Sequence, residues 1–181
     1  MDKDQEIALV TSCQHGDKKA LDTFVRELQK PVYNAAYRML GNPDEAADVT
    51  QTTFLKAIEN IDHFDPKFRL FSWTYRIAVN EALDQLKRRR RTEPLEHSPK
   101  SDMGLPPETV AQSQLCGQVQ ATLMELNEDH RAVIVLRYFG DCSYQDIGRI
   151  LEVPEKTVKS RLFTARKRMK DKLIQHGVFS S

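Results

Sequence analysis

The chain has 181 residues, of which 40% are hydrophobic and 29% are charged, a balance typical of a soluble globular protein with one medium domain or two small ones. Only seven residues are glycine and short alternating apolar runs are few, which argues against a β-rich fold. Lysine and arginine number 27 against 26 aspartate and glutamate residues, so the net charge of +1 does not by itself indicate a polyanionic partner. The basic residues are instead concentrated near residues 87–91 and 156–172.

Apolar residues recur at helical spacing from the N-terminus onward. A helix is predicted over residues 5–28, interrupted at Gly16-Asp17, and Asp17 is suited to cap the helix that continues from there. Pro31 is expected to begin the next helix, because proline lacks the backbone N–H donor that a helix interior needs. Turn-forming residues at 41–44 should end that helix.

The helix predicted over residues 44–60 has an acidic, exposed side. Its internal face is expected to contain the apolar residues Ala47, Phe54, Leu55 and Ile58. Its outward face is expected to contain Glu45, Asp48 and Gln51. On its own, this pattern also fits an ordinary solvated helix surface.

Residues 63–91 combine aromatic and basic side chains in a way that suits unpaired nucleic acid. Asp65-Pro66 predicts a loop, and Ser72 is suited to cap the helix that follows. Aromatic rings can stack on bases, at about 1–3 kcal/mol per base, while cations neutralise phosphates. A bounded loop can also hold a base flipped out of the stack. The alternative is that the aromatic residues belong to the core, as we expect at least of Tyr75.

The composition changes over residues 94–112, which contain four of the eight prolines and show no apolar periodicity. This stretch is predicted to be a flexible linker. The predicted organisation is therefore all-α, with a helical domain over residues 1–93, the linker over 94–112 and a second small helical domain over 113–181.

The second domain is predicted to contain a helix-turn-helix within residues 143–172. A short amphipathic helix ends near Glu152, and Pro154 fits the start of the next helix. That helix has one apolar face, made of Val158, Leu162, Ala165 and Met169, and is otherwise mainly basic. This geometry can enter a DNA major groove. A surface helix with a solvated basic face would show the same pattern.

The three cysteines, Cys13, Cys116 and Cys142, are far apart, and none has the spacing of a zinc ligand. We expect free thiols in a reducing cytoplasm. The N-terminus lacks the features of a signal peptide, and no apolar run approaches the ~20 residues of a membrane span. The sequence predicts a cytoplasmic protein with no membrane insertion, no metal and no cofactor. It is not expected to be an enzyme, because paired carboxylates and a phosphate-binding glycine loop are missing.

Several stretches resemble the sigma-70 family of bacterial transcription initiation factors, and the compact extracytoplasmic-function (ECF) group in particular. Residues 132–169, with the motifs SYQDIG and TVKSRL, are similar to region 4. Residues 20–64 and 71–89 are similar to region 2, including a D-x-x-Q-x-x-F pattern that begins at Asp48. The departures from the usual family residues are Thr52 for an acidic residue, Thr74 for Leu, Asn127 for Pro and Gly148 for Ala. Glycine inside a short helix costs about 1 kcal/mol relative to alanine, so Gly148 is expected to loosen the turn.

The resemblance implies three sets of contact residues. Contacts to the duplex −35 element are implied for Thr157, Lys159, Ser160, Arg161, Phe163, Thr164, Arg166 and Lys167. Contacts to the unpaired −10 element are implied for Phe68, Arg69, Phe71, Trp73, Arg76, Asn80, Asp84, Lys87 and Arg88. Contacts to RNA polymerase are implied for Asp48, Gln51 and Phe54.

The resemblance implies an alternative sigma factor that directs promoter-specific transcription initiation. Its partners would be promoter DNA, an anti-sigma factor and core RNA polymerase, bound through the clamp helices of the largest subunit and the flap of the second. The alternative is an autonomous helix-turn-helix regulator. That class would explain the C-terminal domain but would leave residues 63–91 and the linker without a role. Co-purification with core polymerase would separate the two.

Overall fold

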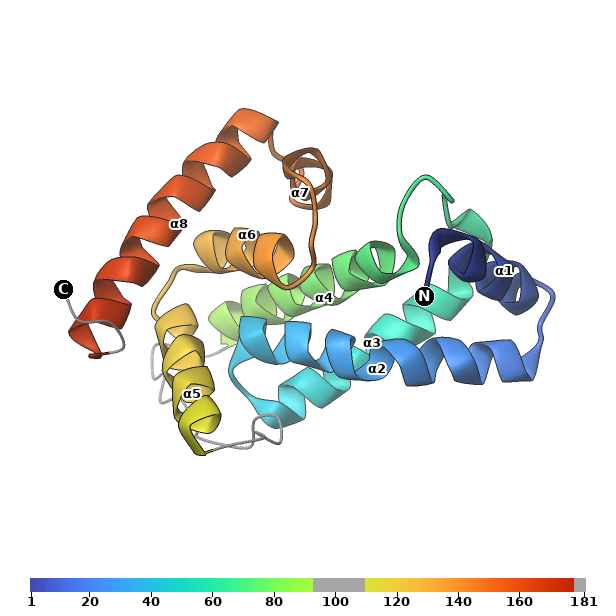
Figure 1. Cartoon of the computed structure of the whole chain (residues 1–181), viewed down its shortest axis with the longest axis horizontal. Coiled ribbons are helices and arrows are strands. Elements are labelled where there is room, and N and C mark those ends of the chain that lie inside the picture. The colour runs from blue at the N-terminus through green and yellow to red at the C-terminus, as the bar shows by residue number, and fades with distance from the viewer. Residues whose placement is uncertain (93–109, 178–181) are drawn as a thin grey trace.

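The computed structural model describes residues 1–92 and 110–177, with side chains described up to residue 91 and from residue 115. These ranges are helical and contain no β-strand, which confirms the predicted all-α fold (Figure 1). The N-terminal domain comprises α1 (Lys3–Gln14), α2 (Lys18–Leu40), α3 (Pro43–Glu59), the 3-10 helix η1 (Ile61–His63) and α4 (Leu70–Thr92). The C-terminal domain comprises α5 (Val110–Met124), α6 (Glu128–Tyr138), α7 (Tyr144–Ile150) and α8 (Glu155–Gln175).

Most of the predicted linker, residues 94–112, lies outside the described residues, although α5 already begins at Val110. None of the helices in the described ranges combines the length and the apolar character that a membrane crossing requires.

Local sequence signals account for most helix ends in the N-terminal domain. The Asp17 carboxylate accepts a hydrogen bond of 2.8 Å from the backbone N–H of Lys19 and so caps α2, as predicted. Gly41 ends α2 with a φ of 69°, a left-handed conformation that favours glycine. Asn42 then caps α3 and accepts a hydrogen bond of 2.9 Å from the N–H of Asp44.

The predicted helix start at Pro31 is wrong, because α2 continues through this residue. A proline inside a helix costs about 3 kcal/mol. The helix is nevertheless held on both sides of Pro31 by one continuous buried stripe, in which each large apolar side chain (Val, Leu, Phe or Met) contributes about 1.5–3 kcal/mol. The stripe consists of Ala20, Phe24, Leu28, Val32, Ala35, Ala36 and Met39.

The predicted internal face of α3 is also wrong in two of its members. Leu55 is 63% exposed and Ala47 is exposed. The buried stripe instead consists of Ala46, Val49, Thr53, Phe54 and Ala57. Small residues determine which side of α3 is buried, because Ala46 and Ala57 are fully buried and allow the close approach of neighbouring helices. Leu55 consequently lies on the outside of the bundle.

The two domains pack directly against each other within the described residues. α2, α3 and α4 lie side by side, and α6 rests against α2 and α4 (Figure 1). The guanidinium group of Arg131 in α6 is buried and donates a hydrogen bond to the carbonyl oxygen of Met39 in α2. Arg38 of α2 stacks over the ring of Phe139, with its guanidinium carbon 3.9 Å from the ring centroid. This contact brings the C-terminal domain against the C-terminal end of α2.

The helix-turn-helix is present as predicted, with α7, a turn at Leu151–Val153 and α8. Pro154 occupies the N-cap position of α8. Gly148 has a packing role in this turn, because a Cβ atom there would lie 2.8 Å from the carbonyl oxygen of Val153. The absence of a side chain therefore lets the turn fold back tightly against α7.

Candidate nucleic-acid interface

The outer face of α8 is the most accessible candidate surface for DNA. Val158, Leu162 and Ala165 turn inward and are buried, so the opposite face of α8 projects from the domain. Lys159, Ser160, Phe163, Arg166 and Lys167 are all exposed. The ring of Phe163 is 72% exposed, which is unusual for an aromatic side chain and gives it no packing role in the core. Thr157, Arg161 and Thr164 are half-buried at the edges of this face.

Neighbouring side chains orient several of the basic groups of α8. Lys159 pairs with Glu155 at 2.7 Å one turn earlier, an exposed ion pair that holds it only weakly. Arg161 reaches Asp129 of α6 at 2.8 Å, so its guanidinium group links α8 to α6. Arg166 donates to the hydroxyl oxygen of Tyr144 at 3.3 Å. This hydrogen bond lowers the pKa of Tyr144.

The second candidate surface lies on α4 and the loop before it. Arg76, Asp84, Lys87 and Arg88 are exposed on α4, and Asn80 is half-buried between them. Asp84 and Lys87 form an exposed ion pair of 3.1 Å. Arg76, Asn80 and Asp84 follow at intervals of one helical turn, so α4 presents them on one side.

Three predicted −10 residues on this surface already make contacts within the protein. Trp73 is only 8% exposed and packs edge-on against Phe64, with ring centroids 5.5 Å apart. Phe71 is half-buried against the ring of Tyr75, which is buried in the core as expected. Arg69 forms an ion pair of 2.7 Å with Glu6 of α1. Contact of these three side chains with DNA stays a prediction, and their present role is structural.

The start of α4 also differs from the prediction. Ser72 was expected to cap this helix but lies inside its first turn, because α4 begins at Leu70. The carbonyl oxygen of Arg69 accepts the first helical hydrogen bond, from the N–H of Trp73 at 3.0 Å. The N-cap position of α4 is therefore Arg69. The acceptor for the N–H of Leu70, the first residue of α4, is the carboxylate of Glu6 in α1.

Helix α7 of the C-terminal domain lies over part of the α4 surface. The guanidinium carbon of Arg149 lies 5.7 Å from the ring centroid of Phe68. A small cavity of about 30 Å³ remains where the domains meet. It is lined by Phe68, Ser72, Trp73 and Arg76 on one side and by Cys142, Asp146, Arg149 and Ile150 on the other. Of the predicted −10 residues, Phe68, Trp73 and Arg76 thus lie beside the C-terminal domain.

The predicted polymerase contacts lie on α3. Asp48 and Gln51 are exposed, whereas Phe54 is 7% exposed and packs edge-on against Phe24 of α2, with ring centroids 5.6 Å apart. Leu55 is exposed on the same side of α3 as Asp48 and Gln51. It follows Asp48 by seven positions, about two helical turns, and Gln51 by four, about one turn. Sequence periodicity assigned Leu55 to the core and therefore missed it as a member of this surface.

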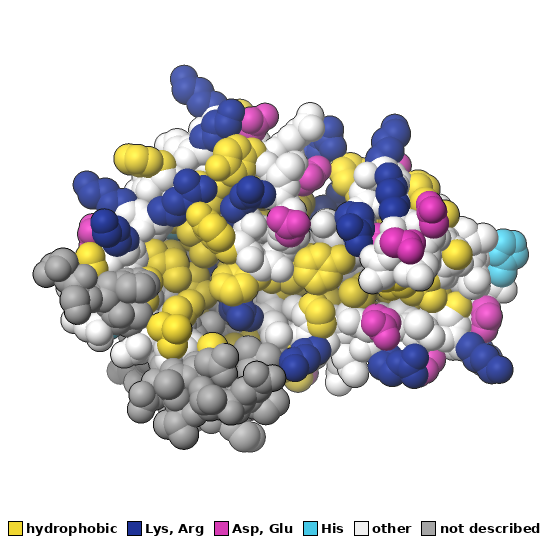
Figure 2. Space-filling view, viewed as in Figure 1, with side chains coloured by type: hydrophobic (Ala, Val, Ile, Leu, Met, Phe, Trp, Pro, Cys, Tyr) yellow, Lys and Arg dark blue, Asp and Glu magenta, His cyan; other side chains and the backbone are white. Residues whose placement is uncertain are grey.

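An apolar groove of about 390 Å³ lies between α6 and α8. Figure 2 shows hydrophobic side chains gathered beside α8, with lysine and arginine side chains along it. The groove is lined by Ile134, Tyr138, Phe139, Arg166, Met169, Lys170 and Leu173. The ring of Tyr138 is 56% exposed at its edge. An apolar floor with a basic rim suits a mixed apolar and acidic protein segment.

Within the described residues, no three histidine, cysteine, aspartate or glutamate side chains gather in a way that could hold a metal ion. The three cysteines are free thiols, with Cys13 and Cys142 buried and Cys116 exposed.

Comparison with known proteins gives a consistent result for both domains. Residues 24–92 match the family model for sigma-70 region 2, and residues 116–169 match that for sigma-70 region 4. The chain is 31% identical to the ECF RNA polymerase sigma factor SigW of Bacillus subtilis over 176 residues, covering 91% of this chain and 94% of that protein. It is 32% identical to the RNA polymerase sigma-H factor of Pseudomonas aeruginosa, covering 96% and 95% of the two chains.

Solved structures share the same fold. The sigma factor RpoE of Bartonella quintana, in complex with the anti-sigma factor NepR, is 25% identical with a TM-score of 0.70, covering 86% of this chain and 97% of that one. CnrH in complex with the cytosolic domain of CnrY is 24% identical with a TM-score of 0.69, covering 96% and 99%.

Proposed function

Because the chain belongs to the ECF group of the sigma-70 family and is an alternative sigma factor that directs transcription initiation, we propose that its two domains bind one core RNA polymerase and contact the two elements of one promoter. The observation that carries the proposal is the pair of separate surfaces, one on α8 and one on α4, each suited to a different form of DNA. No covalent chemistry is assigned to the chain. Its site of action is the cytoplasm, where RNA polymerase transcribes the chromosome.

Helix α8 reads the duplex −35 element. Its exposed face combines cations, a hydroxyl group and an aromatic ring on a helix, the element that enters a DNA major groove. Lys159 is suited to donate to guanine, and the exposed ring of Phe163 is suited to pack on a thymine methyl group. Arg166 and Lys167 continue toward the adjacent phosphates. Arg161 and the half-buried threonines Thr157 and Thr164 complete the edges of the surface.

Helix α4 and the preceding loop bind the unpaired −10 element. The amide of Asn80 can both donate and accept, as recognition of a base edge requires, and its neighbours Arg76 and Asp84 flank it by one turn on each side. Lys87 and Arg88 extend the surface for phosphates. Phe68 is the aromatic side chain of the loop that is only half-buried, and it becomes available for stacking when α7 moves away.

Two further surfaces bind core polymerase. Asp48, Gln51 and the exposed Leu55 of α3 contact the clamp helices of the largest subunit, and Phe54 supports them from the core. The apolar groove between α6 and α8 binds the flap of the second subunit. Thr52, where an acidic residue is usual, is half-buried beside this α3 surface and weakens its charge complementarity.

An anti-sigma factor is a further proposed partner. One structure of similar fold is a complex of this kind, the sigma factor RpoE with the anti-sigma factor NepR. The groove between α6 and α8 offers the apolar area that such a partner needs. An anti-sigma factor that occupied this groove would exclude the polymerase flap.

Run-off transcription with core polymerase over a randomised promoter library tests the proposal. We expect transcripts only when the chain and the core are both present, from promoters with two enriched elements. The double variant Asp48→Arg, Gln51→Ala should fold normally but lose the core polymerase in a pull-down, whereas the Lys159→Ala variant should retain it. Specific DNA binding by the chain without core, and no transcription with it, would instead support an autonomous helix-turn-helix regulator.

A further inference from the structure

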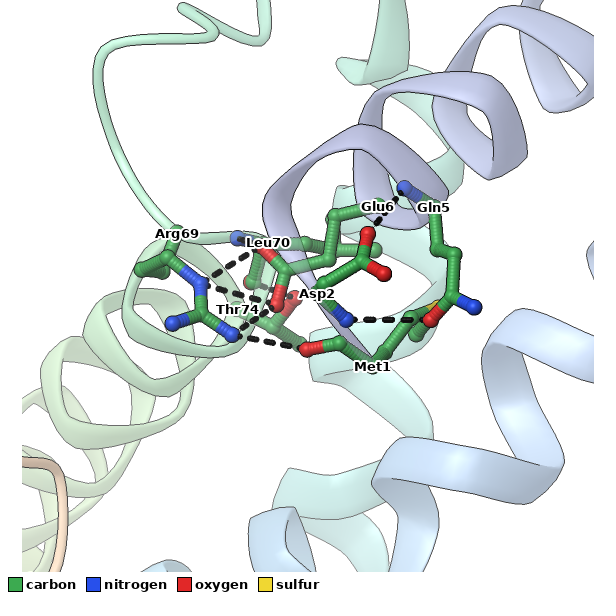
Figure 3. Close-up of polar contacts among 7 residues, drawn as sticks. All are labelled: Met1, Asp2, Gln5, Glu6, Arg69, Leu70 and Thr74. Carbon is green, nitrogen blue, oxygen red and sulfur yellow. Dashed lines mark hydrogen bonds and ion pairs between the residues drawn. The ribbon is translucent and has the colours of Figure 1, made fainter.

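One helix outside the predicted contact surfaces holds the loop before α4 at both ends. The side-chain amide of Gln14, at the end of α1, donates to the carbonyl oxygen of Ile61 at 3.1 Å. Near the start of α1, the carboxylate of Glu6 binds Arg69 and Leu70 (Figure 3). The intervening residues 62–68 include Phe64 and Phe68. Helix α1 thus sets the distance between the two ends of this loop.

Glu6 provides the cap that the start of α4 lacks. Arg69 occupies the N-cap position, but a guanidinium group has no acceptor atom and cannot cap a helix. The Oε2 atom of Glu6 accepts a hydrogen bond of 3.0 Å from the backbone N–H of Leu70, the first residue of α4. A carboxylate at a helix N-terminus is also favoured by the helix dipole. The acceptor comes from a residue 64 positions earlier in the chain.

The same carboxylate holds the side chain of Arg69, which is 54% exposed, in a fixed orientation. The Nε atom of Arg69 lies 3.0 Å from Oε1 and 2.9 Å from Oε2 of Glu6, and the Nη2 atom lies 2.7 Å from Oε1. The Nη2 atom also donates to the carbonyl oxygen of Met1 at 3.0 Å. Both oxygens of Glu6 are therefore satisfied although the residue is only 4% exposed.

We propose that Glu6 is a positioning residue for recognition of the unpaired −10 strand. It fixes where α4 begins and holds Arg69, so that Phe68 in the loop and Arg76 on α4 keep a constant spacing for successive nucleotides. Gln14 fixes the other end of the loop. The inference rests on the proposed function, because it assigns a role within the same −10 surface.

If Arg69 has a different role, removal of the Glu6 charge should change the affinity for unpaired DNA in the opposite direction. If Arg69 were a phosphate contact held back by Glu6, removal of the Glu6 charge would release the guanidinium group and strengthen binding of unpaired DNA. If Glu6 positions the loop and α4, replacing one of its two acceptor oxygens with an amide NH2 group leaves either the N–H of Leu70 or the Arg69 side chain without an acceptor, and binding becomes weaker. The direction of the change therefore separates the two roles.

The test compares Glu6→Gln with Asp4→Asn, an exposed carboxylate in the first turn of the same helix. Val32→Ala serves as a second control, because it destabilises the domain core without removing any group that binds Glu6. Each variant is assayed for core polymerase retention, for open complexes by permanganate reactivity of unpaired thymines, and for −10 base preference on pre-melted templates.

For Glu6→Gln we expect unchanged retention of core polymerase. We expect the yield of open complexes to fall about fivefold or more, because this is the effect of leaving one buried donor without an acceptor. Base preference on pre-melted templates should relax, while Asp4→Asn behaves as the unchanged protein. Val32→Ala should lower the melting temperature without altering base preference. Gln14→Ala should shift base preference in the same direction as Glu6→Gln, and it keeps the test valid if Glu6→Gln does not fold.

Unchanged or stronger binding of the −10 strand by Glu6→Gln would overturn the positioning role. So would additive losses when Glu6→Gln and Arg69→Ala are combined, because a residue that acts through Arg69 must show a coupled effect. Absence of promoter-specific transcription by the unchanged protein would contradict the proposed function itself. The two failures are therefore distinguishable within one set of reactions.

Discussion

The two candidate DNA surfaces differ in their accessibility. On α8, the basic face is open, and the ring of Phe163 is 72% exposed. On α4, Trp73 is 8% exposed, and α7 lies against Phe68 through Arg149. A duplex can therefore dock on α8 without rearrangement, whereas full access to the loop before α4 requires the C-terminal domain to move. Under the proposed function, recognition of the duplex would depend on α8, whereas recognition of the unpaired strand would also depend on the contact between the domains.

Breaking the contact at Arg131 should have the largest effect. Its buried guanidinium group donates to the carbonyl oxygens of Leu123, Met124 and Leu126 at 2.9 Å and to that of Met39 across the domain contact. Arg131→Ala removes these donors, so we expect a loss of about 3 kcal/mol in the free energy of unfolding. Urea denaturation followed by circular dichroism measures it, with the exposed Arg168→Ala as the control. A loss no larger than in the control would show that these carbonyl contacts do not stabilise the folded protein.

A smaller change should move the domains apart while each remains folded. A Cβ atom at Gly140 would lie 2.8 Å from Cδ1 of Tyr75 in the other domain and 2.9 Å from the carbonyl oxygen of Leu136. Gly140→Ala should therefore destabilise the closed arrangement by about 1–3 kcal/mol. We expect a larger radius of gyration in X-ray scattering and tighter binding of an unpaired −10 oligonucleotide.

Gly117→Ala is the matched control for Gly140→Ala, since an added Cβ atom there meets no atom within 4 Å. Equal oligonucleotide affinity in the two variants would mean that α7 does not restrict access to the α4 surface.

The α8 surface should respond to a substitution without any change in domain arrangement. Lys159→Ala removes an exposed side chain whose ion pair with Glu155 contributes little. If Lys159 contacts a base, preference at one or two −35 positions should fall by about 1–3 kcal/mol. Lys156→Ala, in the first turn of the same helix, is the control. Equal weakening on every −35 sequence would make Lys159 a phosphate contact.

The smallest expected effect is the pH dependence contributed by Glu6. Burial raises the pKa of its carboxyl group, but the hydrogen bonds from Arg69 and Leu70 and the charge of Arg69 outweigh this and hold the pKa below its ordinary value of 4.5. A carboxyl group with a lowered pKa in the folded state adds stability above pH 4.5 and loses it as the pH falls through the lowered value. Melting temperatures of Glu6→Gln should therefore decline less steeply below pH 4.5 than those of the unchanged protein. Parallel curves would indicate that Glu6 has the same pKa in both states.

The sequence by itself determined the parts of the protein that depend on neighbouring residues. Helical periodicity established the all-α class, and Asp17, Gly41 and Asn42 stop or cap helices through bonds to nearby backbone groups. The helix-turn-helix and the exposed face of α8 followed from residues within a few turns of one another. Family resemblance then supplied the candidate contact residues on α8, α4 and α3.

Only the tertiary structure decided what depends on distant residues. Pro31 remains helical because the core holds α2 on both sides of it, and Leu55 faces outward because small residues set the buried phase of α3. The cap of α4 was missed because its acceptor, Glu6, lies far away in the chain and no local pattern at Ser72 or Arg69 indicates it. Burial of Trp73 depends in the same way on packing between elements that the sequence does not pair. Local spacing predicts that a segment is helical, but the face that is buried and the element that covers it are set by how all the helices pack together.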